Sequence, residues 1–178
     1  LNASGSVGIW PANSNGEDIE VYTDDTRTTI AGTYYGLRQQ LDIGEKEYWS
    51  QADFIAPKGV AADYIAGFAC TGGLGCDEQK KKFEAKGEID QAILMDALAD
   101  RLAEAFAELI HLKIRKTLWA YSPDENFSLD DLLKVRYQGI RPAPGYPSQP
   151  DHREKRTLWD LLEVDKMSGG TMNSMIRT

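Results

Sequence analysis

Residues 141–147 place one fixed positive charge beside a backbone with little conformational freedom. The run reads RPAPGYP, and its three prolines within six residues fix φ and remove N–H donors. Gly145 admits a backbone geometry or a close approach that a side chain would forbid. The run predicts a stiff, partly extended loop, with the carboxylate-binding guanidinium of Arg141 at one end and the ring of Tyr146 at the other. A proline-rich surface connector is the alternative interpretation.

A second group of residues that could bind a ligand lies upstream, in a segment with helical periodicity. Apolar side chains recur every four residues at Leu94, Leu98, Leu102 and Phe106. We expect this face of the helix to belong to the core. Asp100 and Glu104 form a separate i, i+4 row, so we expect their carboxylates to point to another surface.

Two sequence runs carry a resemblance to a known family. They are YQGIRPAPGYP at 137–147 and ALADRLAEAFAE at 97–108, and together they resemble the C-terminal activation domain of cobalamin-dependent methionine synthase. Further matching runs are WPANS at 10–14, YGLRQQ at 35–40, ADFIAP at 52–57 and LWDLL at 158–162. The runs follow one another in the family's order, which chance matches to short motifs would not do.

The resemblance implies a binding site for S-adenosylmethionine. This ligand is a zwitterionic amino acid joined to a sulfonium and an adenosine. Its site needs a cation for the carboxylate, acceptors for the ammonium and sulfonium, and contacts for the adenine. Arg141 could supply the cation, and carbonyls within 141–145 could act as acceptors, since proline keeps its C=O. By resemblance, the ligand contacts are expected at Glu104, Arg141, Ala143, Gly145 and Tyr146. The alternative for Glu104 is a solvated carboxylate or a pair with Arg101.

The family also implies a reaction and its partners. The complete enzyme transfers a methyl group from methyltetrahydrofolate to homocysteine through cobalamin. This domain presents S-adenosylmethionine for reductive methylation of inactive cobalamin, with an electron from a flavodoxin or diflavin reductase. The expected partners are that reductase and the cobalamin-binding domain of the same enzyme, while zinc, folate and homocysteine sites belong to other modules. Because the sulfonium is an activated methyl donor, the protein's task is to align donor and cofactor. We nominate no catalytic or metal-binding residue and expect no catalysis by this chain alone.

Bulk composition excludes several other classes. The chain has 178 residues, 42% of them apolar and 27% charged, with a net charge of -8, as in ordinary soluble proteins. This charge argues against nucleic-acid binding, and no apolar run approaches the ~20 residues that span a bilayer. No signal peptide is recognisable, so the expected location is the cytoplasm. Cys70 and Cys76 are too few for a disulfide framework and are expected to be reduced. Neither lies at ligand spacing from His111 or His152.

The sequence predicts a single α+β domain with a twisted, mainly antiparallel sheet and helices packed around it. Expected strands are residues 6–10, 19–23, 28–35 and 63–70, the first two joined as a hairpin. Residues 53–57 are too short to classify. The pattern is helical from about Asp77 to Trp119, with a short helix expected to about Ala85 and a long one from about Ile89. Further helices are expected at 128–134, which opens with an N-cap serine, and at 157–165.

Residues 71–75 read TGGLG and join a predicted strand to a predicted helix. Their amides could approach a ligand closely, and the resemblance suggests that this face lies toward cobalamin during reactivation. A simple strand-to-helix turn is the alternative. The run lacks the Gly-Lys-Ser/Thr ending of a P-loop and the spacing of a dinucleotide fingerprint.

Two other functions compete with that of an S-adenosylmethionine-binding activation module. One is a ligand-free module that docks a cobalamin domain or a reductase. The other is an independent methyltransferase, which is disfavoured because no glycine-rich loop follows a first strand with an acidic residue downstream. Against the family pattern, an N-terminal portion with an acidic ligand residue and a C-terminal portion with an aromatic pair are missing, and residues 167–178 diverge. We therefore expect residues 1–178 to form a partial activation domain, either a fragment or a shortened gene product.

Overall fold

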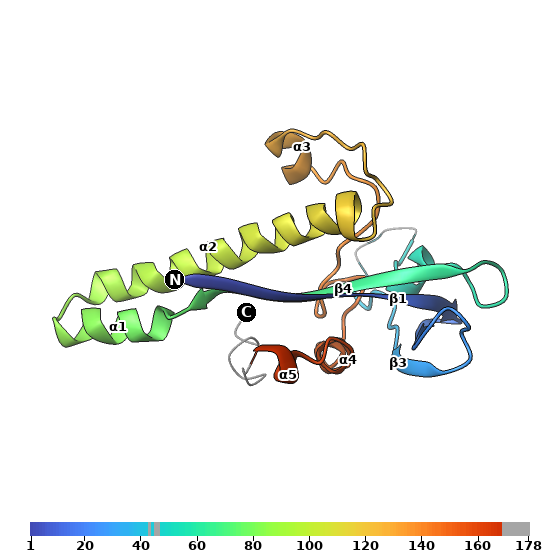
Figure 1. The fold of residues 1–178 in the computed structure, drawn as a ribbon, viewed down its shortest axis with the longest axis horizontal. Coiled ribbons are helices and arrows are strands. Elements are labelled where there is room, and N and C mark those ends of the chain that lie inside the picture. Colours follow the sequence, from blue (N-terminus) through green and yellow to red (C-terminus); the bar gives the residue numbers. More distant parts are fainter. Residues whose placement is uncertain (43, 45–46, 169–178) are drawn as a thin grey trace. The chain divides into compact units, whose positions relative to one another are not determined.

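The computed structural model describes residues 1–42, 44 and 47–168 (Figure 1). The strands are β1 (Asn2–Asn15), β2 (Asp18–Tyr22), β3 (Ile30–Tyr34) and β4 (Asp63–Leu74). The helices are η1 (Gln51–Phe54), α1 (Cys76–Ala85), α2 (Ile89–Lys113), η2 (Ile114–Leu118), α3 (Leu129–Leu133), α4 (Glu154–Leu161) and α5 (Val164–Ser168). The chain forms two compact units. The first unit holds residues 1–7, 68–123 and the described residues from Val164, and the second holds 8–67 and 124–163.

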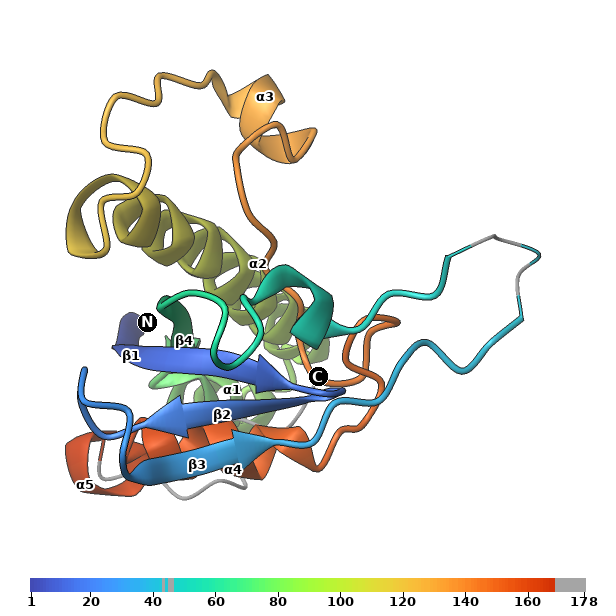
Figure 2. The same cartoon turned by 90° about the vertical axis from the view of Figure 1, so that its right-hand side faces the viewer.

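The strands form one four-stranded sheet in the order β3-β2-β1-β4. β1 and β2 pair antiparallel as a hairpin, with Ala12 opposite Val21. The turn contains Gly16, whose φ of 65° lies in the left-handed region that glycine adopts easily. β2 also pairs antiparallel with β3, and Figure 2 shows these three strands side by side. The predicted α+β class, antiparallel sheet and hairpin are confirmed, although β1 is longer than the predicted 6–10.

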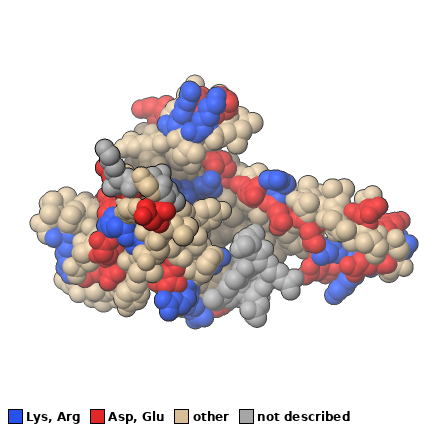
Figure 3. Space-filling view, turned by 180° about the vertical axis from the view of Figure 1, so that it is seen from behind, with Lys and Arg blue, Asp and Glu red and all other residues tan. Residues whose placement is uncertain are grey.

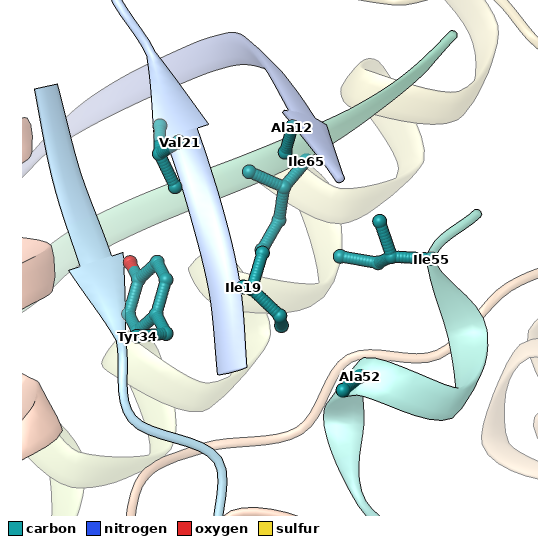
Figure 4. Packing of buried hydrophobic residues seen from close by; sticks show 7 residues of the cluster. All are labelled: Ala12, Ile19, Val21, Tyr34, Ala52, Ile55 and Ile65. Atoms are coloured by element: carbon teal, nitrogen blue, oxygen red, sulfur yellow. The ribbon is translucent and has the colours of Figure 1, made fainter. Parts of the chain in front are cut away.

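The core of the second unit lies between its strands and η1. Its buried residues are Ala12, Ile19, Val21, Tyr34, Ala52, Ile55 and Ile65, with Trp10, Leu158 and Leu161 packed against them. In Figure 4, Ile19, Ile55 and Ile65 turn toward the same interior. η1 begins behind a capping box, in which Ser50 and Asp53 satisfy each other's backbone N–H groups. η1 includes the first two residues of the segment 53–57 that the sequence left unclassified.

The predicted core face of α2 is wrong. Leu94, Leu98 and Leu102 are 60%, 46% and 41% exposed. The helix instead approaches β4 at its glycines: a Cβ added to Gly72 would lie 2.6 Å from the backbone nitrogen of Ala103, and one added to Gly73 would lie 3.3 Å from the Ala99 Cβ. Glycines in β4 therefore let an alanine-bearing face of the helix approach more closely than a leucine face could. Figure 1 shows α1 and α2 lying side by side in this unit.

The ends of the later helices follow local chemistry. α3 begins at the predicted serine cap, where the Ser128 side chain accepts from the N–H of Asp131. The Asp131 carboxylate in turn accepts from the N–H of Ser128. The predicted helix 157–165 is wrong in its bounds. α4 starts three residues earlier, at Glu154, and a break at Glu163, with φ of 49°, separates it from α5. The divergent ending from residue 169 onward lies outside the described residues.

Candidate functional site

The predicted stiff loop is built from two consecutive turns, and we call residues 141–149 the proline loop. In the first turn, the Tyr146 N–H donates to the Ala143 carbonyl over 3.1 Å, with Pro144 and Gly145 between them. Gly145 has φ of 105°. Proline followed by a glycine with positive φ is the pair that a type II turn favours at its centre. The residue types of this loop thus determine its shape.

The second turn locks the first one. The Gln149 N–H donates to the Tyr146 carbonyl over 2.9 Å, and the Gly145 N–H donates to the Gln149 carbonyl over 2.7 Å. The Ser148 carbonyl accepts from the N–H of Gln51 in η1, over 2.9 Å. Gln149 is buried. The loop is therefore closed on itself and fastened to the second unit.

The hydrogen bonds of the proline loop leave backbone acceptors open at its surface. The N–H groups of Gly145, Tyr146 and Gln149 are all used inside the loop. The carbonyls of Pro142 and Pro144 accept no hydrogen bond from any described residue. Arg141 is exposed on the same loop. A guanidinium beside open carbonyls complements a carboxylate beside an ammonium, as in an amino acid.

Four of the five predicted ligand residues lie on this loop. Arg141, Ala143, Gly145 and Tyr146 are all exposed, with Tyr146 at 65%. The fifth, Glu104, lies on α2 in the first unit, and each unit is described by itself. The Glu104 carboxylate is 2.9 Å from the Arg101 guanidinium, and both side chains are largely exposed. The pairing that was the alternative for Glu104 is thus present. Exposed pairs of this kind contribute little stability.

His152 is a residue of this site that the sequence did not single out. A Cβ added to Gly145 would lie 2.2 Å from His152 Cε1 and 2.7 Å from each ring nitrogen. The imidazole therefore occupies the space beside Gly145 that a side chain would need. His152 lies in the turn that leads into α4, where its carbonyl accepts from the Lys155 N–H over 3.2 Å. No sequence signal links residues 145 and 152, because their contact depends on the path of the loop.

The TGGLG run has a structural explanation. β4 continues through Leu74, and Gly75, with φ of 86°, forms the N-cap of α1. Gly72 is buried against α2, as described above. The Cys76 thiol next to this run donates to the Met95 carbonyl over 3.5 Å, and burial raises its pKa, which disfavours a reactive thiolate.

The YGLRQQ run also has a structural role. Arg38 holds the Asp53 carboxylate with bonds of 2.6 and 2.9 Å and contacts Glu17 over 2.7 Å. These contacts lower the pKa of Asp53, with the Arg38 hydrogen bond as the main cause. The Gly36 N–H donates to Asp18 over 3.0 Å. Several runs that resemble the family therefore build the scaffold rather than the site.

The described surface offers no other obvious chemistry. Figure 3 shows acidic and basic side chains interspersed over one face, without a broad basic area among the residues it describes. Within the described ranges, no three His, Cys, Asp or Glu side chains gather as they would around a metal ion. No helix in that part of the chain is long and apolar enough to cross a membrane.

Comparison with known proteins agrees with this fold. A solved structure of the MetH reactivation domain bound to AdoHcy is 49% identical to this chain, with a TM-score of 0.89. The alignment covers 97% of this chain and 54% of the solved one, so this chain spans about half of that protein's length. The family described as "Vitamin B12 dependent methionine synthase, activation domain" matches residues 1–176. Because the match extends over nearly the whole sequence, the chain belongs to the activation-domain family of vitamin B12-dependent methionine synthases.

Proposed function

We propose that this chain binds S-adenosylmethionine and its demethylated product S-adenosylhomocysteine at the proline loop. The observation that carries the proposal is the polarity of that loop, which carries the exposed Arg141 and the open carbonyls of Pro142 and Pro144, while the N–H groups of Gly145, Tyr146 and Gln149 are already used. This pattern suits the amino-acid end of the ligand. The AdoHcy bound to the similar reactivation domain supports the same ligand class.

Each residue of the loop has a distinct proposed role. Arg141 grips the ligand carboxylate with its planar fork. The carbonyls of Pro142 and Pro144 accept from the ammonium. Ala143 keeps the surface low so that the ligand can approach, Gly145 gives the turn its shape, and the exposed ring of Tyr146 covers part of the nucleoside.

Glu104 is proposed as a further contact from α2. To reach a ligand ammonium, its carboxylate would exchange Arg101 for the ligand. Breaking the pair with Arg101 requires little free energy, because an exposed ion pair contributes at most about 1 kcal/mol.

We further propose that the parent protein uses this module to reactivate its cobalamin. Cobalamin, carried by a neighbouring domain, supplies the methyl-accepting centre, and we assign it no ligand in this chain. The residues of this chain bind the sulfonium compound and orient its methyl group, which converts a bimolecular encounter into a positioned one. The proposed partners are the cobalamin-binding domain and a flavodoxin or diflavin reductase, with zinc, folate and homocysteine bound elsewhere in the parent.

Isothermal titration with S-adenosylhomocysteine tests the role of Arg141. Arg141→Ala should weaken binding by about tenfold or more, since a charge-assisted hydrogen bond contributes about 1.5–3 kcal/mol. Arg136→Ala is the matched control, because Arg136 is an exposed arginine of the same unit that pairs with Asp131. Equal affinities for the wild type and Arg141→Ala would refute the assignment.

A second candidate function is a docking module that binds no S-adenosyl compound. The exposed leucines of α2 favour it, because Leu94 and Leu98 are 60% and 46% exposed and large apolar side chains on one face often mark an interaction surface. Titration of the cobalamin-binding domain onto wild type and Leu94→Ser/Leu98→Ser tests this function. Loss of binding in the variant, together with no S-adenosylhomocysteine binding by the parent protein, would favour docking over ligand presentation.

A further inference from the structure

The imidazole of His152 lies against the glycine that shapes the proline loop. The ring occupies the position of the missing side chain at Gly145, with Cε1 2.2 Å from where a Cβ would be. Gly145 also carries the two features on which the loop depends, its φ of 105° and its 2.7 Å hydrogen bond to the Gln149 carbonyl. A group packed on this residue therefore limits how far the turn can move.

The backbone of His152 is itself well anchored. Pro150 precedes it with a fixed φ, and the Asp151 carboxylate accepts from the Arg153 N–H over 2.9 Å and pairs with the Arg153 guanidinium over 2.7 Å. The carbonyls of Asp151 and His152 accept the first two N–H bonds of α4. His152 thus extends from a fixed helix start rather than from a free loop.

α4 connects this anchor to the core of the second unit. Leu158 and Leu161 of α4 pack against the buried cluster, and Leu161 lies directly over Gly32 of β3, with its Cδ2 3.1 Å from where a Cβ would be. Trp159 is buried. A continuous path of contacts therefore runs from the sheet through α4 and His152 to Gly145.

We propose that His152 is a positioning residue for the S-adenosyl ligand, which it serves by holding the Pro144–Gly145 turn in its binding shape. The inference rests on the proposed function of the loop. His152 acts through ring packing, because within the described residues its ring nitrogens form no hydrogen bond. Holding the turn in place before the ligand arrives lowers the ordering cost of binding.

Two readouts on His152→Ala and His152→Phe test the proposal. The first is amide hydrogen exchange of the Gly145 N–H without ligand, which reports opening of its bond to Gln149. The second is affinity for S-adenosylhomocysteine by isothermal titration. In His152→Ala we expect exchange at Gly145 to accelerate by about fivefold or more and affinity to fall by about threefold to thirtyfold, in line with couplings between touching residues. His152→Phe keeps a flat ring and should restore most of both values. Lys134→Ala, an exposed residue of the same unit paired with Asp130, is the control.

The outcomes separate this inference from the proposed function. A wild-type protein that binds no S-adenosylhomocysteine would refute the function, while the exchange rates would still decide whether His152 holds the turn. Unchanged exchange at Gly145 in His152→Ala would overturn the inference. So would a His152→Phe variant as defective as His152→Ala, because the ring nitrogens rather than packing would then be required.

Discussion

Gly72 lies where β4 meets the backbone of α2, and the structure leaves no room for a side chain there. A Cβ on Gly72 would be 2.6 Å from the Ala103 nitrogen and 2.8 Å from Leu102 Cβ. The adjacent Gly73 is a matched control, because its nearest contact would be the Ala99 side chain at 3.3 Å. Neither glycine has a positive φ, so backbone strain does not distinguish them. Only the contact with α2 does.

The expected cost follows from this difference in space. Ordinary contact begins near 3.4 Å, so the Cβ of Gly72→Ala would be about 0.8 Å too close to backbone that cannot rotate away. Overpacking of this kind costs about 1–3 kcal/mol, and each kcal/mol lowers the Tm of a chain of this length by about 2–4 °C. We expect Gly72→Ala to lower the Tm by about 3–10 °C and Gly73→Ala by less than about 2 °C.

Thermal unfolding followed by far-UV circular dichroism measures both variants under the same conditions. The prediction is a clear separation, with Gly72→Ala melting well below Gly73→Ala and the wild type. If the two variants melt together, or if Gly72→Ala melts with the wild type, α2 does not pack on β4 as described. The glycines of the TGGLG run would then need another explanation, such as approach to a ligand.

Two further predictions concern buried carboxylates of the second unit. Burial raises the pKa of Glu154, so its ionisation destabilises the fold as the pH rises above the ordinary value of 4.5. Glu154→Gln should therefore raise the Tm by about 2 °C at pH 7.5, a gain that shrinks toward pH 4.5; a loss of stability at pH 7.5 would contradict this. Hydrogen bonds from Lys58, Asn15 and Tyr22 lower the pKa of Glu20, so its stabilising contribution is present above pH 4.5 and is lost as the pH falls through the lowered value. Glu20→Gln should cost about 1–2 kcal/mol at pH 7 by urea unfolding, and a difference from wild type that did not narrow below pH 4 would oppose this reasoning.

Local chemistry made part of the fold predictable. The prolines and Gly145 predicted a stiff loop, which the structure forms as a turn with a left-handed Gly145, and Ser128 marked the start of α3. Ser50 and Asp53 also have the sequence spacing of a capping box, which is a local signal for the start of η1. These features depend on residues three or fewer positions apart, which is the range over which sequence alone carries geometric information.

The features that were wrong or missed depend on partners distant in the sequence. α2 has a leucine row and an alanine row, and periodicity favours the larger side chains. The structure instead brings the helix backbone at Leu102 and Ala103 against Gly72, a close approach that only a glycine in β4 permits. His152 was missed for a similar reason, because only the folded loop brings Gly145 beneath its ring. The ion pair between Glu104 and Arg101 could be given as an alternative from the sequence, because the two residues lie within one helical turn.

The other proposed roles depend on the binding of S-adenosyl compounds at the proline loop. The most direct measurement is isothermal titration of S-adenosylhomocysteine into the parent protein and into residues 1–178 alone. We expect saturable binding of one ligand per chain by the parent protein, lost or strongly weakened by Arg141→Ala. A parent protein that releases no binding heat and retains no ligand on equilibrium dialysis would contradict it.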